Sequence, residues 1–188
     1  IVVGSDFKFG KDQTGNTEKL KKLDDTYHID TTIIPVIKKK SSKISSTYIR
    51  KLIKNGKVDE VEKYLGRNYK IEGRVVTGEG RGRKLGIPTA NLNLTTDYVL
   101  PPKGVYAAVA HHNDETFKAV VNFGEKPTFS AKDYTIEVHI LDLEKDLYNE
   151  MLEVELYEFI REEKRFSNKD DLISQIKSDI LYTRNILC

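Results

Sequence analysis

The C-terminal two thirds of the chain alternates between short apolar runs and clusters of turn residues. The runs are rich in Val, Ile, Tyr and Thr, as is typical of β-strands, and span 69–77, 104–111, 116–122, 135–143 and 152–160. Turn residues such as those of 101–104 and 112–114 separate them. Short strands at regular spacing predict a small β-barrel.

A helical period replaces this alternation at the end of the chain. Within 169–187 the apolar residues recur at helical spacing: Leu172, Ile173, Ile176, Ile180 and Leu181. Ser167 or Asn168 can cap the first turn, because a side-chain oxygen there accepts a hydrogen bond from a free backbone N–H. The pattern predicts a C-terminal helix that lies across the barrel and covers its core.

The N-terminal third has the pattern of an α/β domain. Apolar runs at 1–3 and 31–37 predict two strands, the first of them buried, joined by a long connection. The hydroxyl residues of 45–47 can cap a helix that ends at Gly56, and a second short helix is expected over 58–65. This order suits the later half of a doubly wound domain, but the segment is too short to complete one. We therefore expect an incomplete domain.

Charge places the boundary between the two parts near Leu65. The net charge is +2, but residues 1–65 carry 14 Lys and Arg against 9 Asp and Glu, whereas residues 66–188 carry 17 against 20. We expect a partial α/β domain over 1–65 and a β-barrel domain over 66–188. The whole chain is then a β-rich α+β protein.

Composition excludes several classes of protein. With 188 residues, 38% hydrophobic and 32% charged, the chain suits one core or two small ones. No run approaches the roughly 20 apolar residues that cross a bilayer, and the N-terminus lacks a signal peptide pattern. The single cysteine, Cys188, excludes an internal disulfide and a cysteine metal cluster. We expect a cytoplasmic monomer that binds neither membrane nor nucleic acid.

The segment 78–91, GEGRGRKLGIPTAN, is the clearest candidate for chemistry. Its glycines let the backbone approach an anion closely, and its basic residues supply compensating charge. Pro88 fixes one backbone angle, while Thr89 and Asn91 offer oxygens that suit a hard cation such as Mg²⁺. The glycines and basic residues are Gly78, Gly80, Gly82, Gly86, Arg81, Arg83 and Lys84.

Other interpretations of this segment stay open. A glycine-rich basic loop is often only a mobile surface turn. Lys84 is followed by Leu85, so the Walker pattern is absent, and Pro88 with its β-prone neighbours argues against the helix of a dinucleotide fingerprint. If phosphate binds here, it binds on a loop between strands.

The run RGxxLGxPTAN within this segment resembles a motif of riboflavin kinases. Further motifs similar to that family follow in the same order: 122–124 (NFG) with 127–129 (PTF), 137–142 (EVHILD), 146–148 (DLY), and the set Arg161, Glu163 and Phe166. Each motif is modest alone, and their order over roughly 69–184 makes the set specific. Phe123, Lys126 and Ile160 depart from the commoner family residues.

The resemblance implies a six-stranded Greek-key barrel with a C-terminal helix. It implies ATP-dependent phosphorylation of riboflavin at its ribityl terminal hydroxyl, giving FMN and ADP. Glu137 would accept the proton of that hydroxyl, and Thr89 and Asn91 would share Mg²⁺ with the ATP phosphates. The other implied positions are Gly78, Gly80, Gly82, Lys84, Gly86 and Pro88 for phosphate, and Arg161, Glu163 and Phe166 for the flavin.

The residues around Glu137 allow this role and also an ordinary one. Strand alternation over 136–141 gives one face with Ile136, Val138 and Ile140 and another with Glu137, His139 and Leu141. The apolar face can fill the core while Glu137 faces a ligand groove, or Glu137 is simply a solvent-facing carboxylate. Arg161 and Phe166 have a similar alternative, an exposed arginine and an anchor for the last helix.

Two motifs in the first part, 4–10 (GSDFKFG) and 44–50 (ISSTYIR), resemble the FMN adenylyltransferase domain that precedes riboflavin kinase in bacterial bifunctional FAD synthetases. This likeness implies that Asp6 and Phe7 border the flavin, whereas the ATP phosphates would meet Ser46, Thr47 and Arg50. The HxGH-like motif of that family is not in this sequence. We therefore expect FAD synthesis of the full-length parent but not of these 188 residues.

Two rival functions remain. One is a nucleic-acid-binding β-barrel that uses the basic patch 81–84 on a phosphodiester backbone. The other is a module that holds a flavin without turnover. A zinc site is less well supported, because the histidines do not recur at the spacing of zinc ligands. A DNA-binding helix-turn-helix is also less well supported, because the helices of 46–65 lack polar side chains that could contact bases.

Overall fold

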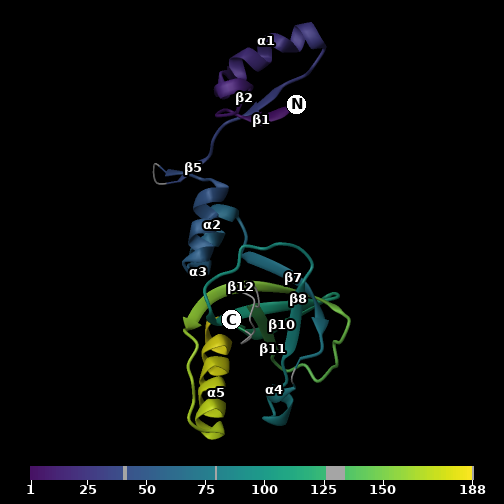
Figure 1. Cartoon of the computed structure of the whole chain (residues 1–188), viewed down its shortest axis with the longest axis vertical. Coiled ribbons are helices and arrows are strands. Elements are labelled where there is room, and N and C mark those ends of the chain that lie inside the picture. The colour runs from purple at the N-terminus through teal and green to yellow at the C-terminus, as the bar shows by residue number, and fades with distance from the viewer. Residues whose placement is uncertain (40–41, 79, 126–133, 188) are drawn as a thin grey trace. The chain divides into compact units, whose positions relative to one another are not determined.

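The computed structural model describes residues 1–39, 42–78, 80–125 and 134–187 (Figure 1). These residues form two compact units, Ile1–Ser46 and Thr47–Cys188. The predicted boundary near Leu65 therefore differs from the division in space. The reason is the packing of two helices described below.

A parallel strand pair with an intervening helix forms the centre of the first unit. Strand β1 (Val2–Gly4) pairs with β4 (Thr32–Ile34), and α1 (Thr17–Tyr27) lies between them in sequence. The Asn16 side chain caps α1 by accepting from the backbone N–H of Lys19, at 2.9 Å. The smaller elements are β2 (Lys8–Phe9), η1 (Lys11–Gln13), β3 (Gly15–Asn16), β5 (Lys38–Lys39) and β6 (Ser42–Lys43).

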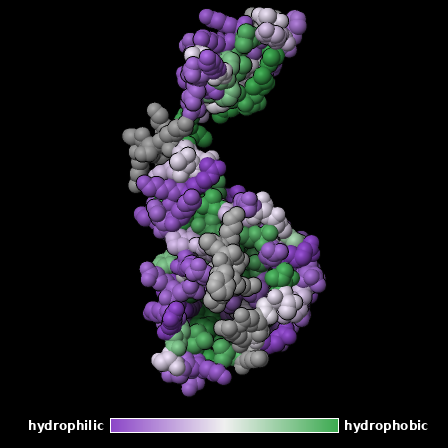
Figure 2. Space-filling view, viewed as in Figure 1, coloured by the Kyte–Doolittle hydropathy of each residue, from purple (hydrophilic) through white to green (hydrophobic). Residues whose placement is uncertain are grey.

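The sequence correctly predicts the β1 and β4 strands but not their environment. Ile1 is 54% exposed and Val2 is 71% exposed, so the prediction of a buried first strand is wrong. The reason is that β1 has a single strand neighbour, because its sheet contains only β1 and β4 in the described part of the chain. Figure 2 shows the resulting hydrophobic surface on this unit. Its exposed large apolar side chains are Ile1, Val2, Phe7, Leu23, Tyr27, Ile34 and Ile37.

The second unit is a closed antiparallel barrel. Its strands are β7 (Tyr69–Val76), β8 (Ala90–Leu94), β9 (Gly104–His112), β10 (Glu115–Glu125), β11 (Tyr134–Ile140) and β12 (Met151–Arg161). They close in the order β10-β11-β8-β7-β12-β9, in which the consecutive strands β8 and β9 are not neighbours, as in a Greek key. The predicted barrel is confirmed. The apolar runs predict five of these strands; the resemblance implied a sixth without placing it, and the structure places it as β8, with the sequence ANLNL.

Alternating side chains fill the barrel. On β12, Leu152, Val154 and Leu156 are fully buried, while the residues between them face outward. Tyr106 and Phe123 are the largest fully buried side chains, and their rings pack edge to face with centroids 5.3 Å apart. One continuous core therefore runs through the barrel.

Helices α2 (Ser46–Lys54) and α3 (Val58–Leu65) pack with the barrel rather than with the first unit. Val58 is fully buried within the barrel core, and α3 contacts β7 and β12. The charge difference at Leu65 marks a change of composition and not a change of packing partner. This is why the division in space comes earlier, at Ser46.

The C-terminal helix α5 (Lys169–Ile186) packs against β9 and β10 and is capped by Asn168, as predicted. Arg161, the last residue of β12, holds Asp179 of this helix through Nε and Nη2, with a shortest N···O distance of 2.7 Å. Asp179 is 2% exposed, so its carboxylate in this ion pair is almost fully excluded from solvent. Leu181 was expected on the buried face but is 61% exposed, because the side that meets the barrel carries Asp179 and Thr183 instead.

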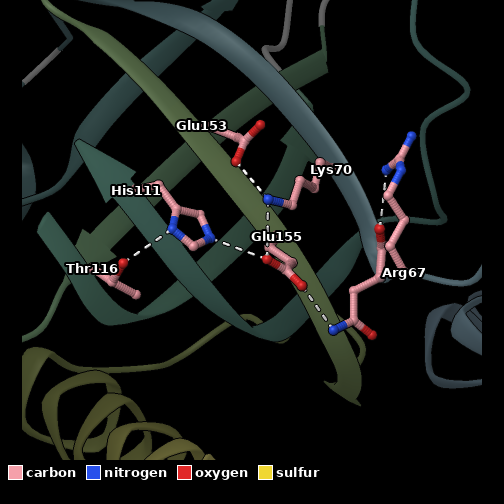
Figure 3. A network of polar contacts seen from close by, with 7 residues as sticks. Arg67, Lys70, His111, Thr116, Glu153 and Glu155 are labelled. Atoms are coloured by element: carbon pink, nitrogen blue, oxygen red, sulfur yellow. Dashed lines mark hydrogen bonds and ion pairs between the residues drawn. The ribbon is translucent and has the colours of Figure 1, made fainter. Parts of the chain in front are cut away.

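A network of polar side chains ties together the outer faces of β7, β9 and β12 (Figure 3). The Glu155 carboxylate accepts from Asn68 Nδ2 at 2.8 Å and from His111 Nε2 at 3.0 Å. Lys70 Nζ lies 2.8 Å from Glu153 and 3.4 Å from Glu155. Partial burial acts to raise the pKa of Glu155, but these hydrogen bonds and the Lys70 charge outweigh it and lower the pKa.

This lowered pKa predicts a pH-dependent contribution of Glu155 to stability. A carboxylate with a depressed folded pKa stabilises the fold above its ordinary value of 4.5, and the stabilisation is lost as pH falls through the folded pKa. We expect Glu155→Gln to lower the free energy of unfolding by about 1 kcal/mol at neutral pH. Urea unfolding of both proteins should show this difference shrinking as pH falls below 4.5. A difference independent of pH contradicts the assignment, and the more exposed Glu153→Gln is the matched control.

The Arg161–Asp179 pair predicts a larger effect. Asp179→Asn leaves a guanidinium that is only 14% exposed without its counter-charge, so we expect a loss of about 3 kcal/mol in the free energy of unfolding. Asp170→Asn, at an exposed position in the first turn of the same helix, should cost less than about 1 kcal/mol. Urea titration followed by circular dichroism measures both, and equal midpoints for the two variants would refute the importance of the pair.

Candidate active site

The register of three neighbouring strands places Glu137 between two asparagines. On β11, Glu137 lies directly opposite Asn91 of β8 on one side and opposite Asn122 of β10 on the other. Residues directly opposite one another in antiparallel strands project from the same face, with Cβ atoms about 5 Å apart. Asn91 and Glu137, distant in sequence, therefore lie side by side on the barrel.

The side chains of β11 alternate as predicted. Ile136, Val138 and Ile140 are buried, whereas Glu137 and His139 are partly exposed. The expectation for Leu141 is wrong, since it is 3% exposed. The strand ends at Ile140, so the alternation no longer applies to the next residue.

The glycine-rich segment connects β7 to β8, as expected of a loop between strands, and it contains one helical turn, α4 (Arg81–Lys84). The short turn differs from the expectation of no helix in this loop. Gly80 and Gly86 flank it with φ angles of 67° and 73°, which side-chain-bearing residues rarely adopt. Pro88 follows the turn and is exposed. The side chains of Arg81 and Lys84, and residue 79, lie outside the described part of the structure.

Two of the glycines allow the loop to lie against the PTAN residues. A Cβ atom added at Gly78 would be 2.1 Å from Asn91 Nδ2, and one added at Gly82 would be 2.3 Å from the Ile87 carbonyl oxygen and 3.2 Å from Thr89 Oγ1. A side chain at position 82 would collide with backbone, whereas one at position 78 would displace the Asn91 side chain. The backbone of the loop lies close to the residues predicted to hold Mg²⁺.

His139 is a residue of this site to which the sequence assigned no role. Its Nδ1 lies 2.7 Å from the carbonyl oxygen of Pro88, so a side chain of β11 contacts the PTAN segment. The sequence does place His139 on the same face as Glu137. Only the fold shows what it contacts.

The predicted flavin residues fall in different environments. Asn122 Nδ2 donates to Glu163 Oε1 at 3.3 Å, which places Glu163 beside the row formed by Asn91, Glu137 and Asn122. Phe166, in the connection from β12 to α5 along the chain, is half-buried. The guanidinium of Arg161 binds Asp179, so in this structure it fastens the last helix, and its contact with a flavin stays a prediction.

A cavity of about 610 Å³ lies next to Glu163. It is lined by Asn55, Gly56, Pro102, Lys103, Tyr134, Phe159, Glu162 and Glu163. A hydrogen bond from Lys103 to Glu125 raises the pKa of Lys103, so the ammonium at this cavity is paired with a carboxylate. A second cavity of about 520 Å³ shares Tyr134 and lies where β8 and β11 diverge, next to Leu92 and Ile136. The first has the volume and mixed lining of a small-molecule site.

Candidate metal ligands are restricted in type. Among the described residues, no group of three or more His, Cys, Asp or Glu could hold a metal ion. Thr89 and Asn91 supply neutral oxygens instead, which suits Mg²⁺ when phosphate oxygens and water complete its shell. The donor set therefore fits an ion that arrives with a nucleotide.

The residues predicted for an adenylyltransferase are divided between the two units. Asp6 and Phe7 lie in the turn after β1, where Phe7 stacks on Phe9 with ring centroids 5.8 Å apart. Ser46 begins α2, and Thr47 and Arg50 follow within that helix in the second unit. Their predicted roles stay predictions.

Comparison with known proteins supports the sequence resemblance. The riboflavin kinase family matches residues 65–187, and the FAD synthetase family matches residues 1–48. The bifunctional riboflavin kinase/FMN adenylyltransferase of Bacillus subtilis is 39% identical over 181 residues, and that of Listeria monocytogenes is 37% identical over 185. The matches cover 95% and 98% of this chain but only 57% and 59% of those proteins.

One solved structure is similar over nearly the whole chain. It is a crystal structure described as a macrolide-efflux protein from Streptococcus pneumoniae, with a TM-score of 0.86 and 36% identity, covering 97% of this chain and 59% of that one. In the part of the present chain that the structure describes, no helix is long and apolar enough to cross a membrane. Since the riboflavin kinase match extends over well more than half of the sequence and includes the entire barrel, the chain belongs to the riboflavin kinase family.

Proposed function

We propose that this chain transfers the γ-phosphoryl group of ATP to the terminal ribityl hydroxyl of riboflavin, giving FMN and ADP. The observation that carries the proposal is the β8–β11 register, which pairs Asn91 with Glu137. This register supports a site in which a phosphate-binding turn and a proton acceptor lie on the same face of one barrel. Phosphoryl transfer needs mainly alignment and charge neutralisation, and these can come from such a pair of elements.

Glu137 is proposed as the general base. Its carboxylate accepts the proton of the riboflavin hydroxyl as the oxygen forms a bond to the γ-phosphorus and the bond to the ADP oxygen breaks. Asn122, opposite Glu137, and Asn91 on its other side flank this carboxylate on neighbouring strands. A carboxylate held within hydrogen-bond reach of the attacking hydroxyl typically contributes about 100- to 10,000-fold in rate.

The glycine-rich loop is proposed to bind the ATP phosphates. Its backbone already lies against Thr89 and Asn91, so a triphosphate on the turn would meet both side chains. These two residues would hold Mg²⁺ together with the phosphates. When bound, the ion neutralises charge on the phosphate oxygens.

The flavin ring is proposed to occupy the cavity next to Glu163. Tyr134 and Phe159 offer aromatic surface there, and its volume of about 610 Å³ is within the usual range for small-molecule sites. The hydrogen bond between Asn122 and Glu163 connects this cavity to the row that contains Glu137. A ribityl chain could therefore extend from the cavity toward the carboxylate.

The relatives suggest a second activity for a longer parent protein. Their printed names include FMN adenylyltransferase, and residues 1–48 match the FAD synthetase family. We propose that activity for the parent only. An assay for FAD from FMN and ATP, run on these 188 residues, tests this separation.

The kinase is tested by incubating the protein with riboflavin, ATP and Mg²⁺ and separating the flavins by chromatography. FMN and ADP in equal amounts are expected. A flavin-binding module would retain flavin without forming ADP. A nucleic-acid-binding barrel would form no FMN and would bind oligonucleotides with a steep dependence on salt.

Glu137→Gln should lower kcat by at least about 100-fold while the affinity for ATP changes little, because the amide cannot accept the proton. Steady-state kinetics and calorimetric ATP titration measure the two quantities. Glu115→Gln, at an exposed position at the far end of β10, is the matched control and should leave kcat unchanged. An unchanged kcat in Glu137→Gln would remove this residue from the catalytic role.

A further inference from the structure

The strand pairing that brings Asn91 to Glu137 stops just before the PTAN proline. The β8–β11 ladder pairs Glu137 with Asn91 and Val138 with Ala90. The same register would set His139 opposite Thr89, but no pairing is formed there. Pro88, one residue further, has no N–H to donate to a neighbouring strand. The segment before Ala90 therefore leaves the sheet without backbone hydrogen bonds to β11.

The His139 side chain takes the place of the missing backbone contact. Its Nδ1 is 2.7 Å from the Pro88 carbonyl oxygen, a normal hydrogen-bond distance. A carbonyl only accepts, so Nδ1 must carry the proton. The ring thus holds the carbonyl of the residue that directly precedes Thr89.

The glycine turn holds the same segment from another direction. The backbone N–H of Ile87 donates to the Gly82 carbonyl at 2.9 Å, and the Gly82 backbone lies close to Thr89 Oγ1. The turn is part of the same loop as the segment, so without a contact to a neighbouring strand the loop can open and break this hydrogen bond. His139 instead belongs to β11, the strand that carries Glu137.

We propose that His139 is a positioning residue: by holding the Pro88 carbonyl, it sets the place of Thr89 relative to Glu137, whereas Asn91 is already placed by the β8–β11 ladder. The inference rests on the proposed kinase function, in which Thr89 and Asn91 meet the nucleotide. It assigns to His139 an effect on nucleotide binding through Pro88, and no direct contact with substrate.

Two substitutions distinguish this role from general support of the strand. The amide nitrogen of asparagine can occupy the position of Nδ1, whereas that of glutamine corresponds to Nε2. His139→Asn should therefore keep the contact with Pro88, and His139→Gln should lose it although it is the larger side chain. Circular dichroism melting confirms that both variants are folded.

Kinetics give the first measurement. We expect His139→Gln to raise KM for ATP by about 3- to 10-fold, as for the loss of one hydrogen bond, with KM for riboflavin within about twofold of the wild type. His139→Asn should stay near the wild type for both substrates. Equal values in the two variants, or equal changes of both KM values, would overturn the inference while leaving the kinase function intact.

Hydrogen exchange in the free protein gives a second measurement that needs no activity. The Ile87 amide should exchange faster in His139→Gln but not in His139→Asn, because only the asparagine keeps the hydrogen bond to the Pro88 carbonyl. The Val75 amide, which donates to the Glu150 carbonyl at 2.9 Å, is the internal reference and should not change. If the wild type makes no FMN, the kinase proposal fails, and unchanged Ile87 exchange in His139→Gln would independently refute the contact.

Discussion

The narrow junction between β8 and β11 is the constraint on which the candidate site depends. These strands close the barrel through the pairs Glu137–Asn91 and Val138–Ala90, and beyond them they diverge around a cavity. A slip of one residue in this register would turn Glu137 into the core and Val138 outward, so burial of the apolar face fixes the register. The hydrophobic core therefore determines which polar residue stands beside Asn91.

The elements around this junction explain its unusual sequence. Glycine at position 82 avoids a collision with the Ile87 carbonyl, and glycine at position 78 leaves room for the Asn91 side chain. Proline at 88 ends the strand pairing, and His139 restores one contact where the ladder stops. Together these features build a rigid support from a segment that the sequence alone describes as a loop.

The sequence predicts the elements of the barrel well and those of the first unit less well. Strands β7 and β12 and helix α3 agree with the predictions within one residue at each end, because regularly placed apolar residues mark their periods. Helix α1 was missed because its sequence, TEKLKKLDDTY, has few apolar residues to mark a period. Strand β8 was not assigned either: its sequence ANLNL alternates apolar and polar residues over only 5 positions, and the resemblance implied a sixth strand without placing it.

The sequence by itself determined the barrel, its last helix, the family, and the candidate residues of the PTAN segment and Glu137, since strand and helix periods and ordered motifs are local properties of a chain. Tertiary structure alone decided that α2 and α3 join the barrel, that Arg161 binds Asp179, and that His139 holds Pro88. Each of these depends on residues distant in sequence meeting through strand register and helix packing. Such contacts form only when the whole core closes, and a local sequence pattern does not predict them.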